Sequence, residues 1–342
     1  MPGSEHREDR AARVRTGGVP GFGLRAALAG IACVVLPLSA GAGGFGLSLP
    51  IDCTPGDGCH IQNYVDHDPG DGKRDYRCGG LSYDGHTGTD FALPTRAALR
   101  AGVDVLAAAP GVVTAIRDGM ADTGADMAAG DIEGRECGNG VRLSHADGYE
   151  TQYCHLARMS VAVRVGQAVD RGDRLGRVGM SGLTQFPHLH LTLRRNGAVI
   201  DPFAPAASGC GGNGQTLWQT PPAYVAGGML EAGFAPALPG YDAIRDGTAA
   251  RPAIPAGADA LVLFGYAFGG RTGDRMTLRI DGPQGILFDQ AMVLDREQAR
   301  FFRAGGKRRN ADRWAPGLYT GTVRLLREGE EIGRMQTRTT IR

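Results

Sequence analysis

Two short histidine motifs, far apart in the chain, contain side chains that could bind a metal ion and move protons. The first motif, GHTGTD, supplies His86 and Asp90, and the second, FPHLHL, supplies His188 and His190. A further histidine, His155, lies between them in the sequence YCHL. A catalytic zinc site needs three protein ligands and an open fourth position for water. These residues could supply such a site, with imidazoles left over for proton transfer.

The second motif continues as PHLHLTL, which has the alternation of a β-strand. Alternate side chains of a strand share a face, so Leu189, Leu191 and Leu193 are expected to point into a core. His188 and His190 then share the opposite face, and the backbone aims two imidazoles at one place. A lone H-x-H is more often a pair of surface histidines, so this motif is not sufficient by itself.

The first motif places a histidine and a carboxylate four residues apart. This spacing puts His86 and Asp90 on one side of an extended segment or one turn apart in a helix, and Gly85 and Gly88 favour the extended form. Both side chain types are zinc ligands. Taken alone, the motif is more typical of a solvated turn. The same holds for His67, which lies between two aspartates and could also bind a cation.

A β-hairpin is predicted on either side of a turn at residues 146–148. Its second strand leads into His155. By alternation, Tyr153 and His155 are expected to share one strand face, with Cys154 on the other. His145, close to the turn, is expected to be a structural histidine held by hydrogen bonds.

The N-terminal residues are typical of an export signal. Several arginines precede an apolar run from Ala26 to Leu38, and an A-x-A cleavage site follows at residues 40–42. We therefore expect residues 1–42 to be a signal peptide, and the mature protein to be periplasmic or secreted. The apolar run is short for a membrane span, so we expect no stable membrane insertion after cleavage.

The cysteines suit an oxidising compartment. Cys33 lies in the expected signal, so six of the seven cysteines remain in the mature chain. An even number in an exported protein indicates disulfides. Folding the predicted hairpin brings Cys137 and Cys154 opposite each other, so we predict a bond between them; the other pairings stay open.

Charge and composition exclude one class of partner. The formal net charge of the 342 residues is only +1, and the arginines do not form one tract. Proteins that bind nucleic acid through its phosphates need a basic surface, so we expect no nucleic-acid partner. The 55 glycines indicate many tight turns, as in loop-rich β structure.

Composition divides the mature chain into four parts. We expect a cysteine-rich segment over 43–80, a mainly β domain with the histidine motifs over 81–208, a linker over 209–255 and a second β domain over 256–342. Regularly spaced strands in the last part suit a small immunoglobulin-like β-sandwich. It contains no histidine, so we expect an accessory or binding module, with a protein partner as one option.

The motifs GHTGTD, YCHL and PHLHL occur in this order, with the glycine-rich VGQAVDRGDRLGRVG between the last two. In this combination the sequence resembles the lysostaphin/LytM-type zinc metalloendopeptidases, which are peptidoglycan hydrolases. The resemblance covers about residues 81–205. It implies a compact antiparallel β peptidase domain with a groove over the sheet, and one Zn2+ per chain.

The resemblance also assigns roles to five side chains. It implies that zinc is bound by His86, Asp90 and His190, and that the catalytic residues are His155 and His188. Zinc activates water, and one histidine takes the proton while peptide cross-links of peptidoglycan are hydrolysed. Which of the two histidines is the base stays open.

Two features depart from the family's usual pattern. Residues 179–186, GMSGLTQF, differ from the usual small-residue stretch before the H-x-H, and the cysteine-rich segment is not general to the family. Relatives that have lost metal ligands suggest the main alternative, a non-catalytic cell-wall-binding or amidase-activating module. Every ligand position is filled here, which favours an enzyme. A zinc peptidase acting on glycine-rich proteins is a third option.

Overall fold

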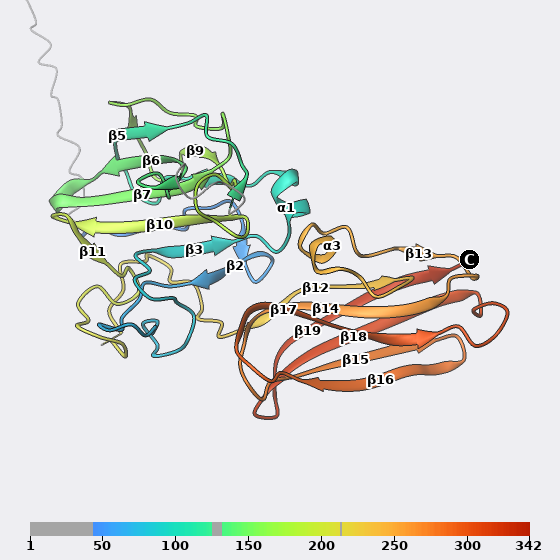
Figure 1. Cartoon of the computed structure of the whole chain (residues 1–342). Coiled ribbons are helices and arrows are strands. Elements are labelled where there is room, and N and C mark those ends of the chain that lie inside the picture. The colour runs from blue at the N-terminus through green and yellow to red at the C-terminus, as the bar shows by residue number, and fades with distance from the viewer. Residues whose placement is uncertain (1–43, 125–131, 213) are drawn as a thin grey trace, which may run out of the picture. The chain divides into compact units, whose positions relative to one another are not determined.

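The computed structural model describes residues 44–342 except 125–131 and 213. The predicted signal peptide, residues 1–42, lies outside the described residues. From Gly44 onward the chain forms one compact unit, and it is mainly β, as expected (Figure 1). Within the described ranges, no helix is long and apolar enough to cross a membrane.

A nine-stranded sheet carries the histidine motifs. Its strand order is β1-β2-β3-β10-β7-β6-β5-β8, and β11 pairs with β10. The strands are β1 (Thr54–Pro55), β2 (Gly58–Asn63), β3 (Thr89–Ala92), β5 (Gly111–Arg117), β6 (Asn139–Ser144), β7 (Tyr149–Leu156), β8 (Ala168–Val169), β10 (His188–Arg195) and β11 (Ala198–Ile200). A short helix, α1 (Arg96–Ala101), and the pair β4 (Asp104–Leu106) and β9 (Arg174–Arg177) complete this part.

Strand β10 lies at the centre of this sheet, between β3 and β7. The predicted alternation is confirmed, because Leu189, Leu191 and Leu193 are all buried in the main core. Burying three leucines on one face fixes the register, since a slip of one residue would turn them all outward. The same register turns His188 and His190 to the other face.

Three disulfides connect segments of the chain, including the cysteine-rich segment that was expected to be irregular. The predicted Cys137–Cys154 bond is confirmed, and the remaining pairs are Cys53–Cys59 and Cys78–Cys210. The cysteine-rich segment was not expected to hold a strand of the main sheet, yet β2 pairs with β3 there. Its sequence GCHIQN shows no polar–apolar alternation because its polar side chains are buried as well.

The C-terminal strands form two sheets around one core. One sheet has the order β12-β14-β17 and the other β13-β19-β18-β15-β16. Their strands are β12 (Gly228–Ala235), β13 (Ala253–Ile254), β14 (Ala260–Gly270), β15 (Arg275–Gly282), β16 (Gly285–Val293), β17 (Gln298–Arg308), β18 (Gly317–Arg327) and β19 (Glu330–Ile341). Leu263, Leu278 and Val323 are fully buried between the sheets, so this part is a β-sandwich. Its immunoglobulin-like topology stays a prediction.

The interval 209–255, expected to be a linker, contains β12 and the short helix α3 (Tyr241–Arg245). Strand β12 was not predicted because its sequence is rich in glycine, and glycine is required there by close packing against the neighbouring strand. A Cβ at Gly233 would lie only 2.7 Å from the Phe264 ring. The domain boundaries stay a prediction, but β12 is a full partner of β14.

Strand β12 also carries a carboxyl group whose burial is unfavourable. Burial raises the pKa of Glu231 to about 7, from an ordinary value of 4.5. Its Oε2 atom is buried with no hydrogen-bond partner among the described residues. The folded state therefore holds the proton more tightly than the unfolded chain, and stability falls as the pH rises from about 4.5 to about 7.

We expect Glu231→Gln to remove this loss. At about pH 8 the free energy of unfolding of the variant should exceed that of the parent protein by on the order of 1 kcal/mol. This figure is reduced because the side chain is partly exposed to solvent. At about pH 4 the two should differ little. Urea unfolding at both pH values measures the difference, and a variant no more stable than the parent at the higher pH would contradict the prediction.

Candidate functional site

Three predicted ligands meet at the edge where β3 faces β10. His190 lies directly opposite Asp90 in the antiparallel register, and His86 lies in the turn just before β3. The Nδ1 atom of His190 is 2.8 Å from Oδ1 of Asp90, and Nε2 of His86 is 3.1 Å and 3.2 Å from these two atoms. The edges of a zinc tetrahedron are about 3.3 Å. The three groups could therefore hold a metal ion together.

Each of these three side chains is fixed through its outward atom. His86 donates from Nδ1 to the Tyr64 carbonyl at 2.7 Å, and His190 donates from Nε2 to the Thr192 hydroxyl at 3.0 Å. The Asn63 amide donates to Oδ2 of Asp90 at 2.8 Å. Such outer partners orient metal ligands and set their tautomers. They leave Nε2 of His86, Nδ1 of His190 and Oδ1 of Asp90 pointing at one place.

The electrostatics favour a cation at this place. Burial opposes ionisation of Asp90, but the neighbouring His86 and His188 outweigh it and hold the pKa of this carboxyl well below its usual range. Burial likewise opposes a charge on His86, and the Asp90 carboxylate nevertheless raises the pKa of that imidazole. The site is thus built around one buried, ionised carboxylate, which needs a positive charge beside it.

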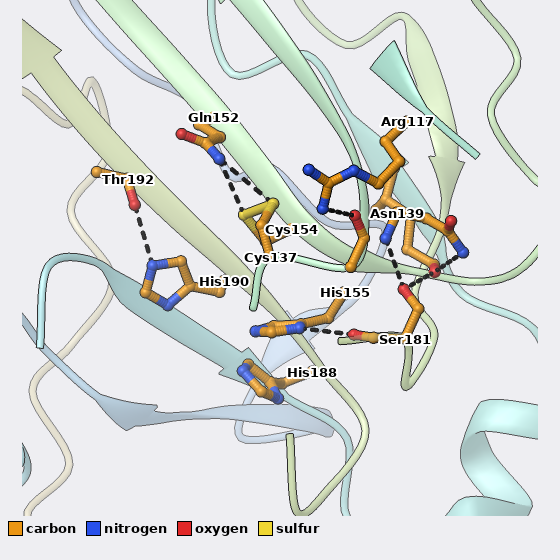
Figure 2. Close-up of a disulfide and its surroundings, with 12 residues drawn as sticks. Arg117, Cys137, Asn139, Gln152, Cys154, His155, Ser181, His188, His190 and Thr192 are labelled. Carbon is orange, nitrogen blue, oxygen red and sulfur yellow. Dashed lines mark hydrogen bonds between the residues drawn. A yellow bond between two sulfur atoms is a disulfide. The ribbon is translucent and has the colours of Figure 1, made fainter. Parts of the chain in front are cut away.

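His155 and His188 lie next to each other beside His190 (Figure 2). The rings of His155 and His188 are 4.6 Å apart, and Nε2 of His188 is 3.5 Å from Oδ1 of Asp90. His155 donates from Nδ1 to the Ser181 carbonyl at 2.8 Å. His188 donates from Nδ1 to the carbonyl of Phe186 at 2.9 Å. In both rings the lone pair is therefore on Nε2, where a proton can be accepted.

Burial keeps both of these imidazoles neutral. It lowers the pKa of His188 to about 4. Burial, together with the charge that His188 can carry, lowers the pKa of His155 well below its usual value. At neutral pH each ring is therefore available as a proton acceptor or as a neutral hydrogen-bonding group.

The orientation of His155 differs from the expectation. Tyr153 points into the core opposite Leu191, and Cys154 lies opposite His190. Alternation would place His155 on the core face with Tyr153, but its φ of 63° turns the side chain toward His188 instead. The prediction of a shared face is wrong because a left-handed residue interrupts the strand geometry.

The disulfide adjoins this unusual residue. The His155 amide donates to the Cys137 carbonyl at 2.8 Å, and Cys137 is bonded to Cys154, the residue before His155 (Figure 2). The Gln152 amide lies within 3.3 Å and 3.5 Å of the two sulfurs. Two interactions thus constrain the backbone conformation of His155: the disulfide at the preceding residue and the hydrogen bond of its own amide.

His145 and His67 are two of the histidines that lie outside the site. His145 is held by the Pro110 carbonyl and the Thr151 hydroxyl, each at 2.7 Å, which confirms the structural interpretation. His67 is not in a solvated turn as expected, because its mostly buried ring pairs with Asp201 at 2.7 Å. No local pattern predicts this pair, because the two residues are distant in the chain.

The outer partners make a testable prediction about metal affinity. Asn63→Ala and Thr192→Val each remove one hydrogen bond from a ligand without removing the ligand. With zinc as the probe ion, we expect each variant to bind the metal about 10- to 100-fold more weakly than the parent protein, as is usual for such partners. Competition with a fluorescent zinc chelator measures the affinity. Unchanged affinity in both variants would show that these hydrogen bonds do not orient the ligands.

Comparison with known proteins agrees with this geometry. Residues 84–202 match the model described as Peptidase family M23. The DD-carboxypeptidase/endopeptidase Mpg of Neisseria meningitidis serogroup B is 35% identical over 123 residues, which are 35% of this chain and 23% of that protein. The peptidoglycan DD-endopeptidase ShyA of Vibrio cholerae serotype O1 is 33% identical over 116 residues, 34% of this chain and 22% of that protein.

A solved structure, the catalytic domain of the M23 protein EnpA from Enterococcus faecalis, is 25% identical. The match covers 43% of this chain and 91% of the EnpA chain, with a TM-score of 0.30. The chain spans about a quarter of the length of the curated relatives named above. The resemblance to LytM-type peptidases is confirmed for the matched segment, which contains all five predicted site residues.

Proposed function

We propose that the M23-like segment makes this chain an exported zinc metalloendopeptidase that hydrolyses the peptide cross-links of bacterial peptidoglycan. The observation that carries the proposal is the convergence of five side chains. Three ligand atoms of His86, Asp90 and His190 face one point, and His155 and His188 lie beside them with their Nδ1 atoms bonded to carbonyls, which leaves the lone pair of each ring on Nε2. The names of the relatives, two of them endopeptidases, support the reaction class.

The donor set fits one zinc ion per chain. Two imidazole nitrogens and one carboxylate oxygen are a known ligand set for catalytic zinc, with the fourth position left to water. A zinc ion held there lowers the pKa of water and polarises a peptide carbonyl. Each ligand already has an outer partner, so no large rearrangement is needed to receive the ion.

The two remaining histidines have different roles in the proposed reaction. One takes the proton from the attacking water through Nε2, and then delivers it to the leaving amine. The other hydrogen-bonds the oxygen on which negative charge develops. Their Nδ1 atoms stay bonded to the carbonyls of Ser181 and Phe186, so the rings keep their orientation while a proton comes and goes.

The disulfide-bonded cysteines support the compartment that we propose. All six that remain after the expected signal peptide are paired in three disulfides. Such bonds persist in oxidising environments and are rare in the cytosol. The proposal therefore places the enzyme in the periplasm or outside the cell, where its peptidoglycan substrate lies.

One experiment tests the proposal directly. The chain from residue 43 is purified, its zinc content is measured, and it is incubated with purified cell wall whose products are identified by mass. We expect about one zinc per chain and conversion of cross-linked dimers to monomers, lost with a chelator and restored by zinc. A metal-free protein that binds wall and leaves the dimers intact would instead be the non-catalytic module.

A further inference from the structure

A cavity of about 530 Å³ adjoins the loop that holds His188. Its walls come from two distant parts of the chain. Thr184 and Phe186 contribute from the loop before β10, and Tyr266 from β14 and Arg300 from β17 contribute from the sandwich. The lining also includes three further arginines, Arg96, Arg245 and Arg296.

The cavity is connected to the candidate site through direct contacts. The Thr184 hydroxyl is 3.0 Å from Nδ1 of His188. The Phe186 ring lies 4.6 Å from the His188 ring, and the Arg300 guanidinium lies over the Phe186 ring, 4.1 Å from its centroid. The guanidinium is thus at most about 9 Å from the imidazole, the span of two to three extended residues.

Arg300 is a partly buried cation whose partners are neutral. Its Nε donates to the Gln62 side-chain oxygen at 2.9 Å, and an Nη donates to the Leu93 carbonyl at 3.3 Å. Burial lowers the pKa of its guanidinium, and no carboxylate lies within 4 Å of it in the part of the chain that the structure describes. A buried charge without a counter-ion is unfavourable, and an anion bound beside it would relieve the cost.

The rest of the lining adds positive charge that is only partly compensated. Arg296 is exposed and has no ion pair among the described residues. Arg245 pairs at 3.7 Å with Asp242, which is 90% exposed. The one acidic residue of the lining, Glu297, pairs with Lys73 at 3.5 Å. The cavity therefore presents an excess of guanidinium groups.

We propose that this cavity binds a carboxylate of the peptide substrate, two to three residues from the bond that is cut. The inference rests on the proposed function, because it needs a peptide chain running past His188. A guanidinium fork matches the planar carboxylate and can bind it through two hydrogen bonds. The sandwich then acts in substrate selection, since Arg296 precedes β17 and Arg300 lies on it.

The test compares two substrates that differ only in charge. One is a cross-linked stem peptide dimer with free carboxylates near the scissile bond, and the other is the same dimer with those groups converted to carboxamides. For the parent protein loaded with zinc, we expect kcat/KM to be about 10- to 100-fold higher for the carboxylate dimer, the range of a charge-assisted hydrogen bond.

Two variants locate the effect. Arg300→Gln and Arg296→Gln should each reduce kcat/KM for the carboxylate dimer and leave the carboxamide dimer almost unchanged. Arg338→Gln is the matched control, because Arg338 is also an exposed arginine of the sandwich but does not line the cavity. Arg296 has no partner to lose among the described residues, so its variant keeps the test informative if Arg300→Gln misfolds.

Equal rates on the two dimers, or an equal loss on both in the variants, would overturn the proposal. Binding of linear, uncleavable stem peptides in the two charge forms separates this proposal from the proposed function. A carboxylate preference that Arg296→Gln removes supports the cavity even if no dimer is cut. Inhibition by inorganic phosphate with no preference between the peptides would show a general anion site and refute it.

Discussion

Replacing His190 by alanine is expected to remove the bound metal and the hydrolytic activity together. His190 supplies one of three ligand atoms, and its Nδ1 is the one closest to Oδ1 of Asp90. Two ligands cannot hold zinc as three do, so we expect the affinity to fall by more than about 100-fold, beyond the effect of losing an outer partner. Zinc content after dialysis and release of monomers from cross-linked wall are the two measurements.

His145→Gln is the matched control for this experiment. His145 is also a hydrogen-bonded histidine of the same sheet region, but its ring hydrogen-bonds to Pro110 and Thr151 and is not one of the three grouped ligands. The control should keep about one zinc per chain and its activity. If His190→Ala retained a full equivalent of zinc, the assignment of this ligand would be wrong. Circular dichroism of each variant checks that the sheet is intact.

Replacing His188 by alanine should separate catalysis from metal binding. The imidazole of His188 has Nε2 available and is not one of the three grouped ligands. We expect zinc to remain and kcat to fall by about 10²- to 10⁴-fold, the usual contribution of a general acid–base group. The KM should change little, because the ring acts on the reacting atoms more than on substrate affinity.

The partner histidine provides the internal check. His155→Ala should show a loss in the same range, and the double variant should lose less than the product of the two single losses, because the rings act as one unit. Full activity of zinc-loaded His188→Ala would eliminate the mechanism. Loss of zinc from that variant would instead assign His188 to the metal and leave the base unidentified.

Much of the site could be predicted because its information is local. The alternation of PHLHLTL orients His188 and His190, and the four-residue spacing keeps His86 and Asp90 together. The hairpin also predicts the Cys137–Cys154 bond. In each case a strand or a tight turn fixes the geometry within a few residues, so a short sequence is sufficient.

The rest depends on tertiary pairing that no local pattern records. Asn63 and Tyr64 support the ligands only because β2 pairs with β3. Arg300 reaches Gln62 from the other end of the sequence. The left-handed φ of His155 is equally invisible, since nothing in YCHL demands it. These features follow from long-range contacts, which override local preferences.

The disulfide beside His155 links the geometry of the active site to the redox state of the compartment. Disulfides form in oxidising compartments, so in the exported enzyme that we propose, the bond between Cys137 and Cys154 would close only after export. Without this bond, the backbone at His155 would lack the covalent constraint that Cys137 places on the preceding residue. On the proposed function, a newly made chain would therefore leave the cytoplasm with a less constrained site, and oxidation would complete that site on the side of the membrane where the proposed substrate lies.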